Sequence, residues 1–287
     1  MAELYVCLSF DYDNISSYIA RGLTSPTMLS RGDFGTVGTD RILALLHAEG
    51  LRSTWFIPGH TIETYPSSVD AVVQAGHEIA HHGWTHRIPA TLGREGEEEE
   101  LRRGNEAIKK LTGAYARGYR SPAWDLSAHT VDLLLTYGFT YDSSLMGDDY
   151  LPYQARRAEM APLDSAFEFG ADTALVEMPI SWTLDDHPHF EFMRYENAIL
   201  PGLMNANLVC ENWINDFVYM RDHYDWGVLT YTFHPHVIGR GHRMIALEKL
   251  IAALTAGGAT FLTMEDAVAK YKQKFPNGRS GRALLIK

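Results

Sequence analysis

Two histidines of this chain have a spacing that suits one shared metal ion. His82 and His86 stand four residues apart, so their imidazoles can converge from one face of a helix or from a tight loop. Histidine pairs of this kind also serve purely structural roles, and the pair by itself does not decide between the two. The metal interpretation therefore depends on a third donor from another part of the chain.

Two aspartates far upstream offer that donor. Asp11 and Asp13 flank Tyr12, and in an extended chain they point to the same side while Tyr12 points away. Like charges this close raise each other's pKa, and a divalent cation would balance them. The alternative is an ordinary turn rich in Asp and Asn. Together with His82 and His86, Asp13 completes a set of ligands typical of zinc or a similar divalent metal, with room for water.

The elements that must position these residues follow from hydrophobic patterning. Short apolar runs alternate with longer amphipathic runs, which predicts repeated βα units around a parallel sheet. The strands are predicted near residues 4–10, 53–57, 77–80, 118–120, 140–142, 174–178, 227–232 and 259–262, with a helix at 39–48. Residues 148–173 read as a long irregular excursion. No linker or repeat interrupts the pattern, so we expect one domain spanning residues 1–287.

The polar segments of the chain cluster where predicted strands end. Asp11 and Asp13 close the first strand, His82 follows the third, Arg120 the fourth and His234 a late one. In α/β barrels, the C-terminal strand ends and the loops after them build the active site. We therefore expect these segments to lie together at the C-terminal end of the barrel and to form one active site.

Composition limits the kinds of partner. The 287 residues are 46% hydrophobic and 21% charged, as in ordinary globular proteins. A net charge of −11 argues against a general affinity for nucleic acid or anionic membranes. No apolar run approaches the ~20 residues of a membrane span, and the first residues do not resemble a secretion signal. Cys7 and Cys210 provide no disulfide framework, so we expect two buried thiols and a cytoplasmic protein.

Two charged groups have competing interpretations. The acidic run from Glu97 to Glu100 is interpreted as a solvated helix face that pairs with basic residues one turn further on. Arg240 and Arg243, three residues apart, either bind a carboxylate or a neighbouring subunit, or simply form salt bridges at a helix start.

The motifs taken together resemble those of the polysaccharide deacetylase family, also known as the NodB-homology or carbohydrate esterase family 4 fold. The resemblance covers most of the chain. Its five motifs correspond, in the family's order, to Ser9-Phe10-Asp11-Tyr12-Asp13, His82-Gly83-Trp84-Thr85-His86, Arg120-Ser121-Pro122-Ala123-Trp124, Asp142-Ser143-Ser144 and Phe233-His234-Pro235.

The resemblance implies a fold, a reaction and roles for residues. The fold is α/β, a distorted (β/α)7 barrel, and the reaction is metal-dependent hydrolysis at an amide carbonyl. The implied roles are general base for Asp11, metal ligands for Asp13, His82 and His86, general acid for His234, and orientation of Asp11 for Arg120. The backbone near Asp142 or Ser143 is a candidate oxyanion site.

One departure from the family's pattern changes the expected substrate. Many members that act on polysaccharides have two adjacent aspartates followed by Gly-Pro, whereas here Tyr12 separates them and Asn14 follows. This form, with residues 148–153 and 239–243, resembles a cytoplasmic branch of peptidoglycan-deacetylase-like proteins, allantoinase-like enzymes and cyclic imide hydrolases. We therefore predict a small cyclic imide, ureide or related amide as substrate, and by resemblance a homo-oligomer, either tetramer or dimer.

Two other functions stay open. One is N-deacetylation of an acetylated sugar or polysaccharide fragment, and the other is an inactive barrel that binds a ligand. In the enzyme interpretations the pocket walls are predicted to come from Trp124, Ser143, Tyr153, Trp182 and Asp185. The alternatives are that these aromatic residues fill the core and that Asp185 caps a following helix.

Overall fold

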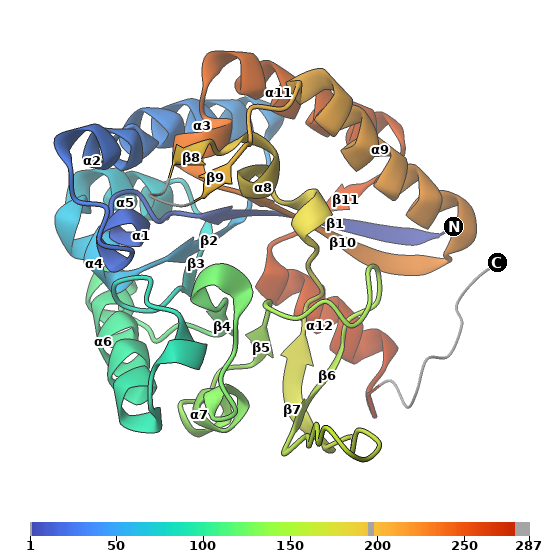
Figure 1. Cartoon of the computed structure of the whole chain (residues 1–287). Coiled ribbons are helices and arrows are strands. Elements are labelled where there is room, and N and C mark those ends of the chain that lie inside the picture. Colours follow the sequence, from blue (N-terminus) through green and yellow to red (C-terminus); the bar gives the residue numbers. More distant parts are fainter. Residues whose placement is uncertain (1, 195–197, 279–287) are drawn as a thin grey trace.

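The computed structural model describes residues 2–194 and 198–278 and shows an open barrel of parallel strands surrounded by helices (Figure 1). Neighbouring parallel strands follow the order β10-β1-β2-β3-β4-β5-β7. Their bounds are β1 (Glu3–Asp11), β2 (Thr54–Ile57), β3 (Glu78–His81), β4 (Gly118–Tyr119), β5 (Tyr141–Asp142), β7 (Ala171–Glu177) and β10 (Trp226–Phe233). Within the described ranges β7 and β10 do not pair, so the barrel is open between them. On the open side of the barrel, an isolated bridge pairs Asp185 with Thr232, and the N–H of Val228 on β10 donates to the carbonyl of Tyr150 at 2.8 Å.

Four further strands complete the sheets. β11 (Thr260–Phe261) pairs with β1, β6 (Tyr153–Arg157) runs antiparallel to β7, and β8 (Met193–Arg194) and β9 (Ile199–Leu200) form a separate hairpin. The helices are α1 (Ser16–Ala20), α2 (Pro26–Asp33), α3 (Gly35–Glu49), α4 (Gly59–Thr64), α5 (Pro66–Gln74), α6 (Arg94–Thr112), α7 (Thr130–Thr136), α8 (Asp186–Phe190), α9 (Ala206–His223), α10 (Pro235–Ile238), α11 (Gly241–Ala256) and α12 (Met264–Lys274). Single 3-10 turns lie at η1 (Pro89–Thr91), η2 (Pro122–Trp124) and η3 (Trp182–Leu184).

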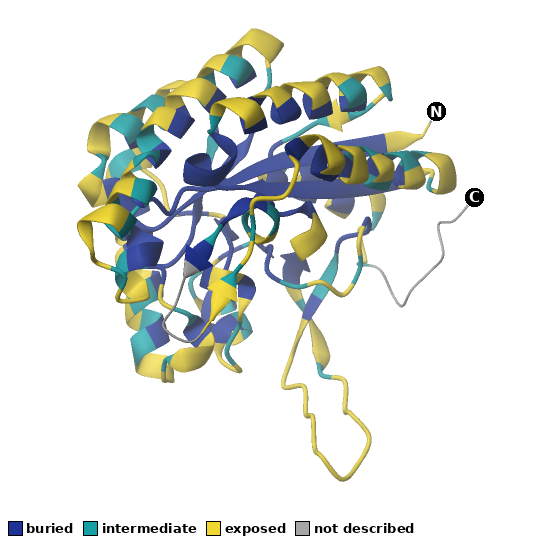
Figure 2. Cartoon of the chain, turned by 45° about the horizontal axis from the view of Figure 1, so that its top comes forward, coloured by how far each residue is buried: buried dark blue, intermediate teal, exposed yellow. Residues whose placement is uncertain are grey.

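The distorted (β/α)7 barrel predicted from the sequence is confirmed. Each of the eight predicted strands overlaps an observed one, and the predicted helix lies within α3. The long irregular excursion predicted over residues 148–173 is confirmed only in part: residues 158–170 form a protruding arm (Figure 2), but the regular strand β6 also lies inside the predicted stretch. Only Ala155 of β6 is buried, so this strand lacks the apolar alternation by which a strand is recognised. A protruding hairpin arm joins it to β7 (Figure 2).

The buried core is formed by the strands and the inner faces of the helices (Figure 2). In β1 and the residues just after it, alternation sends Phe10 and Tyr12 into an apolar cluster around Trp55, at ring-centroid distances of 4.7 and 5.6 Å. The hydroxyl of Tyr12 contacts Ser68 Oγ at 2.5 Å. The residues of opposite parity, Asp11 and Asp13, therefore share the other side, as the sequence predicts.

The structure also bears on the predicted cysteines and on the predicted lack of a membrane span. Cys7 and Cys210 are both buried and free. No helix in the described ranges is long and apolar enough to cross a membrane.

Candidate active site

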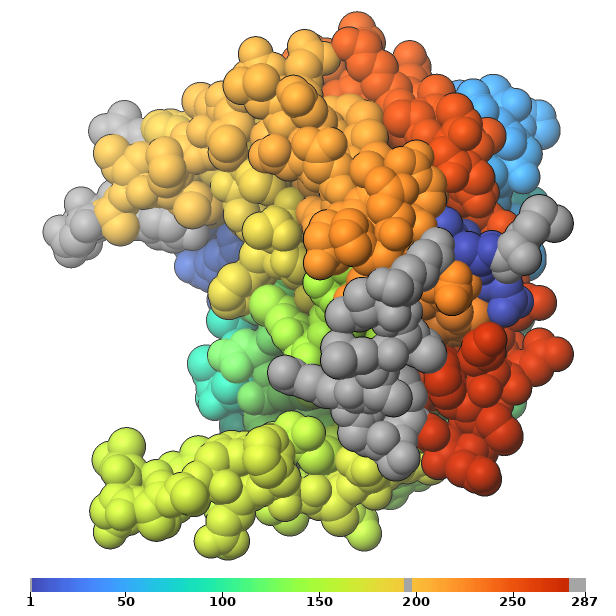
Figure 3. All heavy atoms as spheres, turned by 90° about the vertical axis from the view of Figure 1, so that its right-hand side faces the viewer, coloured from blue at the N-terminus to red at the C-terminus, as the bar shows by residue number. Residues whose placement is uncertain are grey.

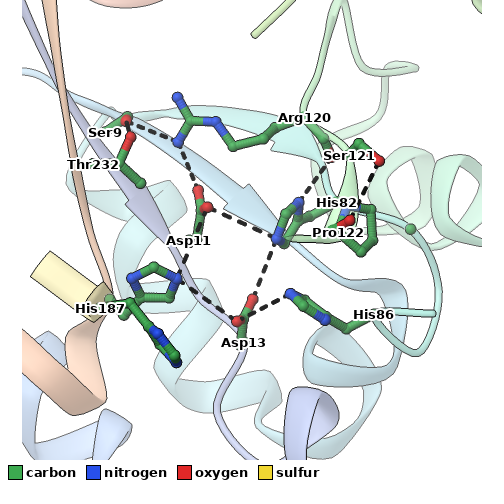
Figure 4. A network of polar contacts seen from close by, with 12 residues as sticks. Ser9, Asp11, Asp13, His82, His86, Arg120, Ser121, Pro122, His187 and Thr232 are labelled. Carbon is green, nitrogen blue, oxygen red and sulfur yellow. Dashed lines mark hydrogen bonds and ion pairs between the residues drawn. The ribbon is translucent and has the colours of Figure 1, made fainter. Parts of the chain in front are cut away.

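Three buried side chains form a cluster suited to a metal ion. Asp13, His82 and His86 each offer one ligand atom, and these atoms lie within 4.8 Å of one another. The two carboxylate oxygens of Asp13 lie 3.4 Å from His82 Nε2 and 3.2 Å from His86 Nε2 (Figure 4). The histidines converge from a loop after β3, not from a helix.

The donor atoms of this cluster fit a divalent cation. His82 Nδ1 lies 2.8 Å from the carbonyl oxygen of Arg120, and since a carbonyl can only accept, Nδ1 carries the proton. His82 Nε2 then presents a lone pair, and it faces Asp13 Oδ1, which also has only lone pairs. Both atoms are buried without a hydrogen-bond partner. A cation satisfies both atoms, and the Nδ1 contact fixes the ring as second-layer contacts of metal ligands do.

Electrostatics also favour positive charge at this point. Burial alone would raise the pKa of the Asp13 carboxyl, but His86 and His82 hold it well below its ordinary value. Burial would lower the pKa of His82, yet Asp11 and Asp13 raise it. For His86 burial prevails over the attraction of Asp13, and its pKa is lowered. Metal binding needs an ionised carboxylate and neutral imidazoles. The lowered pKa of Asp13 favours the ionised carboxylate, and the lowered pKa of His86 favours the neutral imidazole.

The ligand loop is held in an unusual backbone conformation. Gly83 has a φ of 73°, and a Cβ there would lie 3.1 Å from Pro122 Cγ. His86 itself has a φ of 61°, a conformation that costs a residue with a side chain energy and persists where surrounding contacts impose it. The loop therefore depends on outside support.

That support comes from Glu100 on α6. Its Oε2 accepts hydrogen bonds from the backbone N–H groups of Trp84 at 3.0 Å and Thr85 at 2.9 Å. The prediction that the acidic run is only a solvated face was therefore wrong for Glu100. It was also wrong for Glu97, which is buried and accepts from Thr130 Oγ1 at 2.5 Å. Periodicity shows which residues share a helix face, but not which loop packs against it.

Asp11 is oriented by a buried arginine. Arg120 Nη1 donates to Asp11 Oδ1 at 2.7 Å and to Ser9 Oγ at 2.9 Å, and Arg120 is fully buried. Its Nε donates to the carbonyl of Ser143 at 3.0 Å, and Nη2 to Ser143 Oγ at 3.0 Å. The guanidinium also lies 4.1 Å from the ring centroid of Phe56. With its position thus fixed, Arg120 leaves Asp11 Oδ2 facing His82 at 3.8 Å.

His234 approaches the same carboxylates from β10. Its Nε2 lies 4.0 Å from Asp11 Oδ2 and 3.9 Å from Asp13 Oδ2. Its Nδ1 donates to Asp186 Oδ1 at 2.8 Å, and its backbone N–H also donates to Asp186. Burial would lower the pKa of His234, but Asp185 and Asp186 raise it to about 10. Sequence reasoning did not identify Asp186 as the residue that orients His234.

The cavity over these groups has a volume of about 200 Å³. Its lining residues are Asp11, Asp13, Arg21, His82, His86, Ala123, Trp124, Trp182, Asp185, His187, Pro188 and His234. Trp124 and Trp182 stand nearly parallel, with an interplanar angle of 11° and ring centroids 6.5 Å apart. Arg21 and His187 were not predicted, since neither belongs to a recognisable motif.

The five predicted wall residues divide into two groups. Trp124, Trp182 and Asp185 line the cavity, and Asp185 also caps α8 by accepting from the N–H of His187 at 2.8 Å. Ser143 and Tyr153 are absent from its described lining. The hydroxyl of Ser143 instead donates to the carbonyl of Met178 at 3.0 Å, while the hydroxyl of Tyr153 accepts from the N–H of Gly147.

Beneath Ser143 lies a buried pair of carboxyls that sequence reasoning missed. Asp142 and Glu177 are register partners on β5 and β7. Glu177 Oε1 accepts from the N–H groups of Ser144 and Leu145, both at 2.9 Å. The other oxygens, Asp142 Oδ2 and Glu177 Oε2, are buried without a partner, as expected if the two carboxyls share a proton. Burial and the charge of Asp142 raise the pKa of Glu177 well above its usual range, and burial raises that of Asp142 to about 6.

Comparison with known proteins agrees with this architecture. A sequence profile described as polysaccharide deacetylase matches residues 22–141. A peptidoglycan deacetylase of Helicobacter pylori is 33% identical over 96% of this chain and 98% of that protein. The crystal structure of a Mycobacterium smegmatis protein grouped with the polysaccharide deacetylases is 31% identical, with a TM-score of 0.81 over 97% of this chain and 93% of that chain. Puue allantoinase, 19% identical, shares the fold with a TM-score of 0.76 over 96% and 92%.

The role of Glu100 in the ligand loop can be tested through metal affinity. Replacing Glu100 by Ala leaves the N–H groups of Trp84 and Thr85 without their acceptor, so the loop loses its support. We expect the affinity for Zn²⁺ to fall about 10- to 100-fold, as for other contacts behind metal ligands. A chelator-competition titration of the metal-free protein measures it. The matched control is Glu99→Ala, since Glu99 forms an ion pair with Arg102 at the surface and, among the described residues, does not contact the ligand loop. Equal affinities in the two variants would contradict this role.

The Asp142–Glu177 pair predicts a pH dependence of stability. The folded state holds a proton that the unfolded chain releases, so folding stability falls as pH rises through the raised pKa values. Glu177→Gln keeps an oxygen for Ser144 and Leu145 and supplies an N–H in place of the shared proton. As pH rises from about 6 to about 9, the parent protein should lose stability and the variant should not, so we expect the Tm of the variant minus the Tm of the parent to increase by several degrees. This follows because one unit of pKa shift corresponds to ~1.4 kcal/mol of stability, and each kcal/mol changes Tm by roughly 2–4 °C. Thermal unfolding curves across this range measure it, with the exposed-site change Glu49→Gln as control. Parallel Tm-versus-pH curves for Glu177→Gln and the parent would refute a shared proton.

Proposed function

The chain belongs to the polysaccharide deacetylase family, and from this premise we propose that it hydrolyses a small cyclic imide, ureide or related amide with a divalent metal ion, most simply zinc. Membership makes it a hydrolase of carbon–nitrogen bonds other than peptide bonds. The finer assignment of substrate and of residue roles is our proposal.

The observation that supports a small substrate is the size and shape of the cavity. Its volume of about 200 Å³ lies below the roughly 300–1,000 Å³ of pockets for drug-sized ligands. Trp124 and Trp182 border it with nearly parallel indole rings, and flat rings pack well against such faces. Trp182 is 57% exposed, so it stands at the entrance, whereas Trp124 lies deeper. One small planar ring suits this space better than a polymer segment.

Asp13, His82 and His86 would hold the metal ion. Once bound, such an ion supplies a Lewis acid that polarises an amide carbonyl. The burial of all three side chains keeps competing solvent away from their donor atoms. Arg120 and Glu100 fix the ligand loop from two sides, the first through His82 Nδ1 and the second through the backbone of Trp84 and Thr85.

Asp11 is the proposed general base. Arg120 occupies one of its carboxylate oxygens with a charge-assisted hydrogen bond and so fixes the orientation of the carboxylate. The second oxygen faces the cavity and accepts a proton from the attacking water. The water's hydroxyl adds to the carbonyl carbon, and its proton leaves by way of Asp11.

His234 is the proposed general acid. With Nδ1 hydrogen-bonded to Asp186, its Nε2 is the nitrogen that faces Asp11 and Asp13. A raised pKa keeps the imidazole protonated and able to donate to the leaving nitrogen as the carbon–nitrogen bond breaks. For a cyclic imide, one water is consumed and the products would be one carboxylate and one amide on the same opened chain, together with one released proton, so atoms and charge balance.

A second candidate function is the removal of an acetyl group from an N-acetylated sugar. The printed name of the Helicobacter pylori relative, a peptidoglycan deacetylase, favours it. The same base, acid and ligands would serve that reaction, since an acetamide presents the same carbonyl and leaving nitrogen. Indole faces such as that of Trp182 also pack against sugar rings.

Three broader expectations also remain our proposals: one catalytic domain, a homo-oligomer and a cytoplasmic location. Self-association is supported by the arm between β6 and β7, which projects at the lower left of Figure 3 and exposes Leu163, Phe167 and Phe169. Exposed apolar side chains gathered on a protrusion are typical of an interaction site. Buried, free cysteines suit a reducing compartment.

A substrate panel separates the two candidate reactions. The zinc-loaded protein would be incubated with succinimide, hydantoin, allantoin, N-acetylglucosamine and its oligomers, and ring opening and acetate release would be measured in parallel. We expect ring opening of at least one cyclic compound and a fall of at least about 100-fold in kcat for Asp11→Asn, because proton transfer in the transition state contributes this much.

The surface variant Asp40→Asn serves as the matched control and should retain the parent rate. Acetate release without any ring opening would replace the imide proposal by the sugar deacetylase. Ring opening that persists in Asp11→Asn would remove Asp11 from the role of base while leaving the substrate class intact.

A further inference from the structure

A second cavity, of about 240 Å³, lies where the N-terminal end of α11 meets α2 and the segment after α8. In Figure 1 these elements lie in the upper part of the molecule. The cavity shares no lining residue with the metal cavity. Its ionisable lining is Arg31, Glu191, His236, Arg240, His242 and Arg243, together with the hydroxyl of Tyr18.

Positive charge predominates in this cavity. Glu191 is its one carboxylate among the described residues, and it already pairs with Arg31 and accepts from the hydroxyl of Tyr18 at 2.8 Å. Within the described ranges neither Arg240 nor Arg243 forms an ion pair. Arg243 donates to the carbonyls of Val237 and Phe190, while the guanidinium of Arg240 lies 3.5 Å from the ring centroid of Phe34. Two guanidinium charges thus lack a carboxylate contact, in a chain whose net charge is −11.

The backbone adds a second source of positive potential. α11 is a 16-residue helix that begins at Gly241, with no side-chain cap and no acidic residue in its first turn. In the described chain nothing accepts a hydrogen bond from the N–H of Gly241 or His242. The first N–H groups of a helix together with its dipole favour an anion.

Two buried polar atoms in the cavity lining point independently to a missing partner. Arg243 is 7% exposed, and its Nε has no hydrogen-bond partner; His236 is 4% exposed, and its Nδ1 has none. Buried donors without partners are rare in folded proteins, because each costs roughly 1–3 kcal/mol. An oxygen-rich ligand in the cavity would offer an acceptor to Arg243 and, through a bound hydroxyl or water, a partner to His236.

We propose that this cavity is a binding site for a small oxyanion, a carboxylate or a phosphate, held by Arg240, Arg243 and the first N–H groups of α11. The guanidinium fork matches the planar oxygens of a carboxylate and the oxygens of a phosphate. The site is independent of the hydrolytic reaction, since it shares no residue with the metal cavity. It also assigns a function to Arg240 and Arg243, which take no part in the proposed catalytic reaction.

The test measures anion binding by calorimetry, with the zinc-loaded protein, succinate and inorganic phosphate as separate probes and ionic strength held constant with chloride. We expect saturable binding of one or both probes. Binding of succinate alone identifies a carboxylate site, phosphate alone a phosphate site, and both a general oxyanion site. Absence of binding for both probes would overturn the proposal.

Variants locate the bound anion. Arg240→Gln removes a partly exposed charge that forms no ion pair with any described residue, and we expect the affinity for the anion to fall at least about tenfold, as for the loss of a charged hydrogen bond. Arg240→Glu places a carboxylate at the site and should abolish binding even if Arg240→Gln is poorly folded. The matched control is Arg94→Gln, since Arg94 is exposed at the start of α6 and lies outside the cavity lining.

A further variant separates this cavity from the metal centre. His86→Ala removes a proposed metal ligand and should bind the anion as the parent protein does. Loss of anion binding in His86→Ala would place the ligand at the metal centre and overturn the proposal, as would equal weakening by Arg94→Gln and Arg240→Gln.

Discussion

Two carboxylates buried at the end of one strand impose the constraint on which the site depends. Asp11 and Asp13 are only 1% and 2% exposed, and unpaired charges in such surroundings are too costly to persist. Asp11 is balanced by the equally buried Arg120, and removing either partner of such a pair costs about 3–5 kcal/mol. Asp13 has only histidines beside it among the described residues: His82 is held in the tautomer that cannot donate to it, and His234 lies 3.9 Å away, beyond hydrogen-bond distance. The structure thus leaves a place for one more positive charge.

Arg120 connects the Asp11 carboxylate to several other strands of the barrel. One side chain joins β1 through Asp11 and Ser9, the segment after β5 through Ser143, and the ligand loop through its own carbonyl and His82. The segment after β5 is in turn held by Glu177, whose carboxyl group accepts hydrogen bonds from the backbone N–H groups of Ser144 and Leu145. Burial and the charge of Asp142 raise the pKa of Glu177. The parallel order of the strands makes these contacts possible, because it brings the C-terminal ends of β1, β3, β4 and β5 to one edge.

The sequence predicted those parts of the site that lie in short local patterns. The spacing of Asp11 with Asp13 and of His82 with His86, and the positions of Arg120 and His234 at predicted strand ends, suffice to bring these residues together once the sheet is parallel. Tyr12 was correctly expected to point away, since strand alternation alone decides it.

The residues that hold these groups in place could not be predicted in the same way. Asp186, Glu100 and Glu177 act through tertiary contacts across 48, 15 to 16 and 32 to 33 positions of sequence, and each sits in a segment that local rules explain as a cap, a surface face or a strand. Ser143 belongs to a motif and was assigned to the pocket wall, whereas it contacts Arg120. Motifs identify groups that react, but the partners that orient them depend on packing.

The account rests on a divalent ion at Asp13, His82 and His86, and metal-linked stability tests it most directly. Thermal unfolding of the chelator-treated protein would be recorded with and without Zn²⁺, for the parent and for His86→Ala. At a free zinc concentration of about 100 times the dissociation constant, binding stabilises the folded state by ~2.7 kcal/mol, a rise of roughly 5–10 °C in Tm. The account predicts this rise in the parent and its loss in His86→Ala. No rise in the parent, or an equal rise in His86→Ala, would contradict it.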